Sequence, residues 1–436
     1  MTSDPREVIA QSPMSRIQIA VVAITVGLNA LDGFDVLAIS FASPGIARDW
    51  GIDRAALGFI LSMELFGMGL GSVLLGGVAD KIGRRRTLLG CLIVMAFGML
   101  MAARAGGVYE LSVWRVFTGI GIGGMLAATN AVVAEFSNAR RRSLNVSLMV
   151  IGYPVGAVVG GSIAALLLKE GDWRMVFVFG ASATAVFIPL VLWLVPESIA
   201  WLCRRQPAAA LAGVNRSLTR MGYPQVAQLP AVSAQERKRS VGDIFSPRLA
   251  RITVLVTIAY FFHITTFYFI LKWVPKIVVD MGFTPSSAAG VLVWANIGGA
   301  TGGAVFGLLA QRVGLKHLTM FVLVVSTLMV SIFGRGQVAL AQLSLVCAIS
   351  GFFTNAGVVG LYNLMARAFP THVRATGTGF AIGFGRAGAW LSPIIAGYLF
   401  RAGYGLQFVA ITMGAGSLLA VIALWILPHQ ADAAAI

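Results

Sequence analysis

Apolar runs long enough to cross a lipid bilayer make up most of this 436-residue sequence. A helix needs about 20 apolar residues to span the hydrocarbon core of a membrane. Twelve runs reach this length, at 17–42, 55–79, 87–105, 109–136, 143–168, 174–196, 250–279, 285–311, 316–335, 338–366, 375–401 and 405–427. Because 58% of the residues are hydrophobic and only 11% are charged, a soluble fold is excluded. We therefore predict an all-α membrane protein with twelve transmembrane helices.

A polar stretch between the sixth and seventh runs divides the predicted helices into six and six. We predict an amino-terminal six-helix bundle at 1–196, a cytoplasmic linker at 197–249, and a carboxyl-terminal six-helix bundle with a short tail at 250–436. Residues 76–85 (GGVADKIGRR) have a counterpart at 307–316 (GLLAQRVGLK), in the same place within each half. Duplicated halves of this kind are typical of secondary transporters, whose binding sites lie between the two copies near the membrane midplane.

The basic residues lie in short clusters between the apolar runs, and this arrangement sets the predicted orientation. Most of the 33 lysines and arginines fall on the side that holds both termini and the central linker. By the positive-inside rule this side is cytoplasmic, so we expect a multi-pass protein of a bacterial inner membrane with both termini in the cytoplasm. Topology thereby explains the net charge of +16 without a nucleic acid partner. The first run continues into Asp32 without a small-residue cleavage site, which predicts a transmembrane helix and not a removable signal peptide.

The three cysteines and four histidines are scattered along the chain. Their spacing indicates neither a disulfide framework nor a metal site. The sequence also shows no combination of nucleophile, base and metal that would indicate an enzyme. We expect a monomer that works in the lipid bilayer without a cofactor.

Two carboxylates, Asp32 and Asp35, lie inside the first apolar run. A carboxylate near the bilayer centre costs roughly 2.5–3.5 kcal/mol on insertion scales, so this pair indicates a function. Because the two positions are three residues apart, both side chains share one helix face. Arg115, in the fourth run, falls at about the depth of Asp35, and an ion pair between them is geometrically allowed.

An Asp beside an Arg stays ionised, whereas a second nearby carboxylate is pushed toward its protonated form. Two acids and one Arg can therefore hold a single exchangeable proton, and we hypothesise that Asp32, Asp35 and Arg115 couple transport to protons. The alternative is a structural ion-pair network that only joins helices. Glu64, in the second run, is a third acid at similar depth. We place Glu64 with the proton-coupling residues. Because the sequence assigns it no partner, local pairing is the alternative.

Arg386 lies close to the middle of the eleventh run, within GFGRAG at 383–388. The flanking glycines allow a neighbouring backbone to approach closely. A planar and permanently charged guanidinium suits a carboxylate ligand. The second half has no acid within its apolar runs apart from Asp280 near the outer end of one of them. We therefore predict that Arg386 binds the carboxylate of the substrate, and the alternative partner is an acid of the protein.

The seventh run contributes two further candidates, His263 and Lys272, on roughly opposite helix faces. Lys272 is near enough to the outer surface to snorkel, which is the commoner role, and attraction of the substrate is the alternative. His263 is able to titrate near neutral pH, and a hydrogen-bonded structural role is the alternative. Four aromatic and amide side chains complete the candidate substrate-binding set, namely Tyr260, Trp294, Asn296 and Trp390. For these residues, packing against other helices or lipid is the alternative.

Several segments together resemble one transporter family. Residues 76–86 resemble the signature between the second and third helices of the major facilitator superfamily, and RVFTGIGIG at 115–123 resembles its fourth-helix motif. Other segments resemble the aromatic acid:proton symporters within that superfamily, namely LDGFD at 31–35, FASPGIARDWG at 41–51, PES at 196–198, RATG at 374–377 and GRAG at 385–388. The resemblance implies a twelve-helix bundle that imports benzoate-like compounds with protons by alternating access.

The resemblance also implies a charge latch at the cytoplasmic side, which steadies the outward-open state through ion pairs that break and reform at small cost. The residues that match it are Gly77, Asp80, Gly83, Arg84, Arg85, Glu135 and Arg142. In the second copy Gln311 stands where the acid is expected, so we assign no latch to that half.

One segment resembles an exporter. Residues 152–156 (GYPVG) partly match the glycine-proline motif of drug:proton antiporters, but Ala157 stands where that motif has a proline. We therefore predict a secondary active transporter that imports an aromatic or related organic acid by proton symport. The alternative is proton-coupled efflux of aromatic or drug-like compounds.

Overall fold

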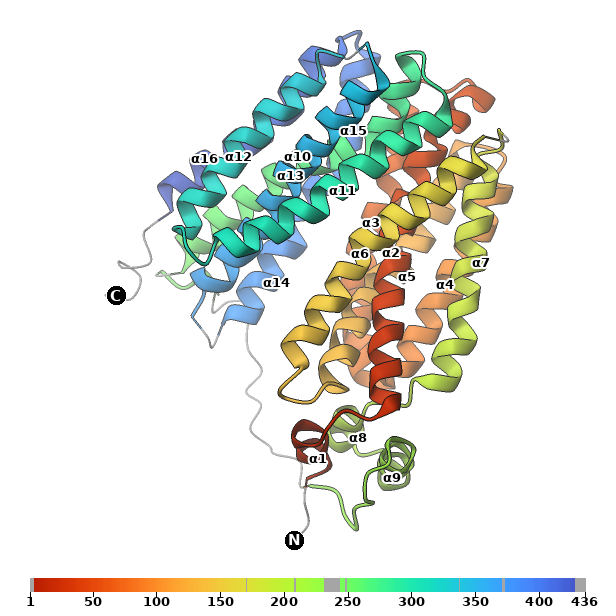
Figure 1. Cartoon of the computed structure of the whole chain (residues 1–436), viewed down its shortest axis with the longest axis vertical. Helices are drawn as coiled ribbons and strands as arrows, with labels where there is room; N and C mark the ends of the chain where they lie inside the picture. Colours follow the sequence, from red (N-terminus) through yellow and green to blue (C-terminus); the bar gives the residue numbers. More distant parts are fainter. Residues whose placement is uncertain are drawn as a thin grey trace. The chain divides into compact units, whose positions relative to one another are not determined.

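The computed structural model describes residues 4–169, 171–207, 209–230, 244–247, 249–336, 338–370 and 373–427. These residues are mainly helical because long apolar segments in a membrane satisfy their backbone hydrogen bonds within each helix. Figure 1 shows the helices, which are α1 Pro5–Gln11, α2 Arg16–Trp50, α3 Arg54–Ile82, α4 Arg84–Arg104, α5 Val108–Glu135, α6 Arg142–Leu167, α7 Arg174–Leu194, α8 Ile199–Arg205, α9 Ala210–Met221, α10 Ala250–Asp280, α11 Pro285–Leu309, α12 Leu315–Phe333, α13 Leu340–Ala368, α14 Arg374–Gly385, α15 Ala387–Arg401 and α16 Leu406–Ile426.

Among the described residues, 11 helices are long and apolar enough to cross a membrane. They begin and end within a few residues of eleven of the predicted runs, apart from α2, which continues to Trp50. The remaining predicted run, 375–401, forms two consecutive helices, α14 and α15, that meet at Arg386. Glycine is a poor helix former, and three glycines surround this position, which explains why the regular helix is interrupted there.

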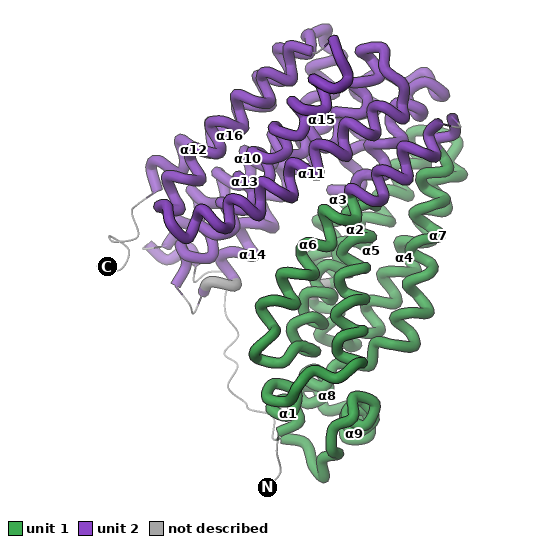
Figure 2. The backbone as a smooth tube through the Cα atoms, viewed as in Figure 1, with its two compact units in different colours: residues 1–36, 66–157, 174–236 green, residues 37–65, 158–173, 237–436 purple. Residues whose placement is uncertain are grey.

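The chain forms two compact units, coloured separately in Figure 2. Unit 1 contains residues Met1–Val36, Phe66–Ala157 and Arg174–Glu236. Unit 2 contains Leu37–Leu65, Val158–Trp173 and Arg237–Ile436. Helices α2, α3 and α6 therefore each contribute one part to unit 1 and another part to unit 2. Our division into bundles at 1–196 and 250–436 stays a prediction.

Close helix contacts in unit 1 depend on glycines, because a Cβ atom at these positions would overlap a neighbouring backbone. Cβ atoms at Gly33 and Gly156 would overlap the carbonyl oxygens of Tyr153 and Ala30, which brings α2 and α6 together. A Cβ at Gly67 would overlap the carbonyl of Val116, so α3 and α5 approach in the same way. Small residues at such crossings let membrane helices pack by van der Waals contact, which is how α2 is positioned.

Unit 2 uses the same device. A Cβ at Gly298 would overlap the Ala348 carbonyl, and one at Gly351 would overlap the Ala295 carbonyl, so α11 and α13 lie in close contact. Gly388 at the start of α15 faces the Phe261 carbonyl of α10. The glycines that surround the α14–α15 junction thus bring it against α10.

The predicted linker contains structure that its polar composition did not indicate. Helices α8 and α9 lie within it, and their apolar side chains Trp201, Leu202 and Leu218 are buried. Ser198 caps α8 by accepting a hydrogen bond from the Trp201 backbone N–H at 3.1 Å. Residues 231–243 of the predicted linker and 428–436 of the predicted tail lie outside the described residues.

Candidate functional site

The two acids of α2 are both buried in unit 1, with 3% of Asp32 and none of Asp35 exposed. A Cβ placed on Gly180 of α7 would lie 3.2 Å from Oδ1 of Asp35, so this carboxylate packs against the backbone of α7. The absence of a side chain at Gly180 leaves room for the acid. The burial of both acids shows that this part of α2 faces other helices of unit 1.

Arg115 of α5 reaches the same level of unit 1 and is fully buried. Its Nη2 donates to the backbone carbonyl of Asp35 at 3.0 Å, and its Nη1 lies 2.9 Å from the sulfur of Met99. The guanidinium carbon also lies 5.4 Å from the centre of the Phe177 ring, within range of a cation–π interaction. This hydrogen bond joins Arg115 to Asp35 through the backbone, and the predicted ion pair between their side chains stays a prediction.

The predicted charge latch is assembled in unit 1 around Arg84, the first residue of α4. The side chain of Arg84 bonds to Asp80 at 2.7 Å and to Glu135 at 3.1 Å. Only 7% of the Arg84 side chain is exposed, so the latch has a buried cation at its centre. Asp80 also lies 3.5 Å from Arg204 of α8, which the sequence did not assign to the latch.

Glu197 is a further member that the sequence argument did not assign to the latch, although it lies in the PES segment. Its Oε1 accepts hydrogen bonds from the backbone N–H groups of Arg84 at 2.7 Å and Ser198 at 3.0 Å. Gly83 precedes α4 with a φ of 107°, a conformation that favours glycine, and a Cβ there would overlap Glu197. The acid therefore caps α4 and needs a glycine beside it.

The other predicted latch residues take more peripheral positions. Arg85 donates through its side chain to the Leu192 carbonyl and through its backbone to Glu197. Gly77 is exposed, and a Cβ there would meet no atom within 4 Å. Arg142 is the exposed first residue of α6 and forms no ion pair with any residue that the structure describes.

In unit 2, Arg386 lies partly buried at the junction of α14 and α15. A Cβ on the preceding Gly385 would overlap the Tyr260 ring, so the junction packs directly on this side of α10. The backbone remains tightly wound there, because the N–H of Ala389 bonds to the Arg386 carbonyl at 2.9 Å. Trp390 follows one turn later and is also partly buried.

Three tyrosines accompany Arg386. The hydroxyls of Tyr260 and Tyr362 lie 3.1 Å apart, with ring centres separated by 5.6 Å. Tyr268 lies about two turns after Tyr260 on the same helix, α10. Tyr268 and Tyr362 were not among the predicted site residues, and no spacing signal connects α13 to α10 in the sequence. A cation beside aromatic rings and hydroxyls suits an aromatic carboxylate.

Lys272 does not snorkel, so the commoner role considered for it is wrong. Its Nζ lies 3.6 Å from Oε2 of Glu64, and neither side chain is exposed at all. Helix side chains lean toward the N-terminus of their helix, so Lys272 points back along α10 and away from the nearer end. Glu64 thus has the partner that the sequence could not assign, and both residues belong to unit 2.

His263 is held between three helices of unit 2, as its structural alternative suggested. Its ring nitrogens lie 2.9 Å from the Ser417 hydroxyl and 2.8 Å from the Thr354 carbonyl. Asn296 donates to the Leu292 carbonyl of its own helix at 2.8 Å. Trp294 lies on the exposed side of α11, with 52% of its surface accessible.

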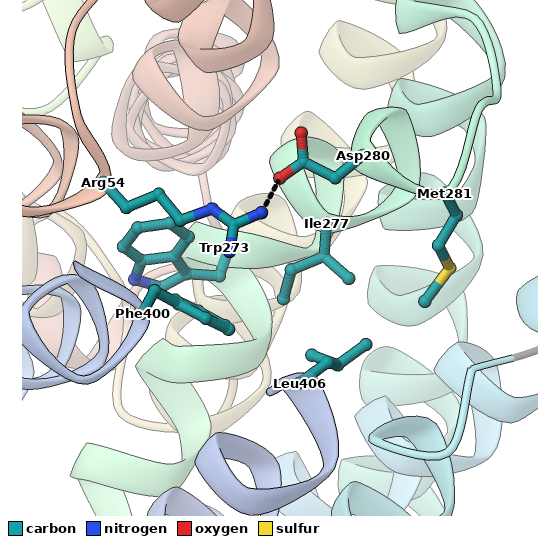
Figure 3. A pocket seen from close by; sticks show the side chains of 7 residues that line it. All are labelled: Arg54, Trp273, Ile277, Asp280, Met281, Phe400 and Leu406. Carbon is teal, nitrogen blue, oxygen red and sulfur yellow. Dashed lines mark hydrogen bonds and ion pairs between the residues drawn. The ribbon is translucent and has the colours of Figure 1, made fainter. Parts of the chain in front are cut away.

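A cavity of about 220 Å³ lies at the C-terminal end of α10 in unit 2 (Figure 3). Arg54 bonds to Asp280 at 3.0 Å and stands 5.1 Å from the centre of the Phe400 ring. Asp280 also pairs with Lys276, one turn earlier on α10. Because Arg54 and Asp280 are partly exposed, this pair contributes little stability. The cavity is lined by Arg54, Trp273, Ile277, Asp280, Met281, Phe400 and Leu406.

A family model described as the Major Facilitator Superfamily matches residues 25–334 and 256–435. The chain belongs to the Major Facilitator Superfamily. A member of this superfamily is a transport protein and not an enzyme, in agreement with the prediction. The resemblance that the sequence motifs indicated is thereby confirmed.

Curated members of the superfamily resemble the chain over nearly its whole length. A gallate transporter of Pseudomonas putida is 28% identical over 97% of this chain and 94% of that protein. A 3-(3-hydroxy-phenyl)propionate transporter of Escherichia coli (strain K12) is 30% identical over 93% of each chain. A 4-hydroxybenzoate transporter of Pseudomonas putida is 30% identical over 93% of this chain and 91% of that protein.

Solved structures confirm the predicted fold of the major facilitator type. The xylose transporter XylE of E. coli, in an inward-open conformation, matches with a TM-score of 0.72 and 18% sequence identity. The match covers 94% of this chain and 96% of that one. At this identity the likeness concerns the fold and not the substrate.

Proposed function

We propose that this superfamily member imports an aromatic acid together with protons. The observation that carries the proposal is the packing of the junction that holds Arg386 against the Tyr260 ring, whose hydroxyl lies 3.1 Å from that of Tyr362. The guanidinium suits the carboxylate and the aromatic side chains suit the ring of such a substrate. The relatives named above are transporters of gallate, 3-(3-hydroxyphenyl)propionate and 4-hydroxybenzoate, which all combine a carboxylate with a hydroxylated ring.

The acids of α2 supply the proton-coupling step of this proposal. Asp32 and Asp35 are buried, and Arg115 holds the Asp35 backbone. Two neighbouring carboxylates resist being ionised together, so one of them takes up a proton readily. Arg386 then binds the anion in unit 2 while the acids of unit 1 carry the proton.

Alternating access fits this division because the ion pairs of Arg84 with Asp80 and Glu135 join α3, α4 and α5 at the predicted latch, so that two arrangements of these pairs could accompany two conformations. The distribution of basic residues supports a bacterial inner membrane location with both termini in the cytoplasm. We propose that one chain forms the transport unit.

Proton movement in proteoliposomes tests this function. The purified protein is reconstituted with a pH-sensitive dye inside the vesicles, and gallate, 4-hydroxybenzoate or 3-(3-hydroxyphenyl)propionate is added outside. Symport predicts that the vesicle interior becomes more acidic as the anion enters. Loss of protons from the interior would instead support the efflux antiporter.

A variant of Arg386 separates transport from leakage of the free acid across the lipid. Arg386→Ala is expected to lose saturable uptake while it remains in the membrane, because the anion loses its cationic ligand. Arg251→Ala serves as the matched control, since Arg251 is an exposed arginine whose side chain bonds to the Ile426 carbonyl. Saturable uptake of normal affinity in Arg386→Ala would reject the assignment of this residue.

A further inference from the structure

The buried pair of Glu64 and Lys272 is an unusual feature of unit 2 that the proposed function does not yet use. Both side chains are fully buried, and their charged atoms lie 3.6 Å apart. Ionic groups in the membrane interior are expensive and are commonly functional. Removing one partner of a buried pair leaves an uncompensated charge, so neither residue can change its charge alone without a new partner.

The surroundings of the pair connect it to the proposed substrate site. Tyr268 lies one turn before Lys272 on the same side of α10. The α14–α15 junction packs on the same helix just before Tyr268, since a Cβ at Gly388 would lie 2.8 Å from the hydroxyl oxygen of Thr265. Lys272 lies 3.6 Å from Glu64, Tyr268 lies one turn from Lys272 on α10, and Arg386 lies at the junction that packs on this helix.

Contacts between α3 and α15 bring Glu64 toward the same region. A Cβ at Gly58 of α3 would lie 3.2 Å from the Cα of Gly397 and would overlap the Pro393 carbonyl. A Cβ at Gly397 would also overlap the carbonyl of Arg54, so α3 and α15 run in opposite directions. Going along α3 from Gly58 to Glu64 therefore leads toward the start of α15 and Arg386. Glu64 of α3 and the junction that holds Arg386 thus approach this part of α10 from different helices.

We propose that Lys272 exchanges partners during transport, and this inference rests on the proposed function. Without substrate, the Lys272 ammonium pairs with the Glu64 carboxylate. When Glu64 takes a proton to become a neutral carboxylic acid, Lys272 pairs with the carboxylate of the aromatic acid beside Arg386. One proton and one monovalent anion enter together, so the charge of the Glu64–Lys272 site is the same before and after binding.

This exchange gives a physical reason why binding of the anion is coupled to binding of a proton. The anion alone would bring a second carboxylate beside Glu64, and the proton alone would remove the negative charge that faces Lys272. Joint binding replaces the negative charge of Glu64 with that of the substrate. The proton on Glu64 adds to any proton carried by the Asp32 and Asp35 pair.

Binding measurements over a pH range test the exchange. The probe is whichever of gallate, 4-hydroxybenzoate and 3-(3-hydroxyphenyl)propionate the wild-type protein carries in the proteoliposome assay. Binding that requires one proton weakens by about tenfold for each pH unit above the pKa of the proton acceptor. We expect Glu64→Gln to bind the probe with a pH dependence smaller by one proton than that of the wild type. Asp280→Asn, which neutralises the acid at the end of α10, should keep the wild-type dependence.

The lysine is tested with its neighbour as control. Lys272→Met should weaken probe binding by about tenfold or more at every pH, as expected for loss of one charge-assisted contact. Lys276→Met, one turn away on α10, should bind like the wild type. Wild-type affinity in Lys272→Met, or an unchanged pH dependence in Glu64→Gln, would overturn the proposal.

The double variant Glu64→Gln/Lys272→Met separates exchange from a purely structural pair. It removes both charges of the pair together, so it should fold even where a single variant, which leaves one charge behind, does not. Partner exchange predicts weak binding and the smaller pH dependence in the double variant, whereas a structural pair predicts recovery of wild-type binding. If the wild type moves no protons with the anion, the proposed function itself fails; if it does and Glu64→Gln keeps the wild-type dependence, only the exchange fails.

Discussion

The guanidinium of Arg115 donates a hydrogen bond to the backbone carbonyl of Asp35 at 3.0 Å. A backbone carbonyl remains an acceptor whatever the protonation state of its own side chain. Arg115 therefore joins α2 and α5 through a bond that would persist if the Asp35 carboxylate gained or lost a proton, as we propose. This arrangement is useful for a coupling acid, because titration of Asp35 need not disrupt the packing of unit 1.

Neutralising an α2 acid should separate exchange from proton-driven accumulation. Asp35→Asn and Asp32→Asn are each expected to keep the exchange of internal for external substrate. In a pH gradient of one unit, each variant should accumulate about tenfold less substrate, because one coupled proton contributes that factor. Counterflow and concentrative uptake in the same proteoliposomes provide the measurement. Glu110→Gln, which changes an exposed acid at the start of α5, is the control. Full accumulation in both Asn variants would reject the coupling role.

Adding a methyl group beside Arg386 should damage the site in a position-specific way. Gly385→Ala places its Cβ against the Tyr260 ring, so we expect a loss of stability of about 1–3 kcal/mol and weaker probe binding. Gly383→Ala is the matched control, because a Cβ there meets no atom within 4 Å. Thermal unfolding and probe titration report the two effects. Equal behaviour of the two variants would show that the junction does not depend on its contact with α10.

The latch should be sensitive at Gly83 and insensitive at Gly77. Gly83→Ala forces a φ of 107° on a residue with a side chain and crowds Glu197, so a loss of about 1–3 kcal/mol is expected. Gly77→Ala has open space and should change stability little. Thermal unfolding and uptake rates of both variants provide the comparison. A strong effect at Gly77 would instead support its predicted place in the latch.

The thiol of Cys203 in α8 should react slowly at neutral pH. Burial raises the pKa of the Cys203 thiol to about 11, because the charged thiolate is poorly solvated there. The reactive thiolate is therefore scarce near pH 7 and should increase by about tenfold for each pH unit until the pH approaches that value.

Maleimide labelling of folded protein at several pH values measures this dependence. An engineered cysteine at Val338, which is 97% exposed, serves as the reactive reference. Because the raised pKa favours the protonated thiol in the folded state, the associated stabilisation is present below the unfolded pKa and is lost as the pH rises toward 11. Labelling of Cys203 at the rate of the reference would contradict its burial.

Much of the fold is predictable because the membrane imposes a length and a hydropathy on each spanning helix. The predicted run at 109–136 corresponds to α5 at Val108–Glu135, and the run at 250–279 corresponds to α10 at Ala250–Asp280. The helices of the linker were not predicted, because α8 and α9 are short and their buried residues are interspersed with polar ones. The interruption at Arg386 was not predicted either, because hydropathy alone does not detect a change in backbone winding.

The sequence by itself determined the number and approximate bounds of the spanning segments, and it identified the charged residues within them. It also indicated that Arg115 lies at the level of Asp35, because depth follows from position along a helix. Only the tertiary structure decided that Lys272 pairs with Glu64 and that Tyr362 lies beside Tyr260. These contacts join separate helices, and their geometry depends on how side chains lean and on where glycines allow backbones to approach, which a linear pattern does not encode.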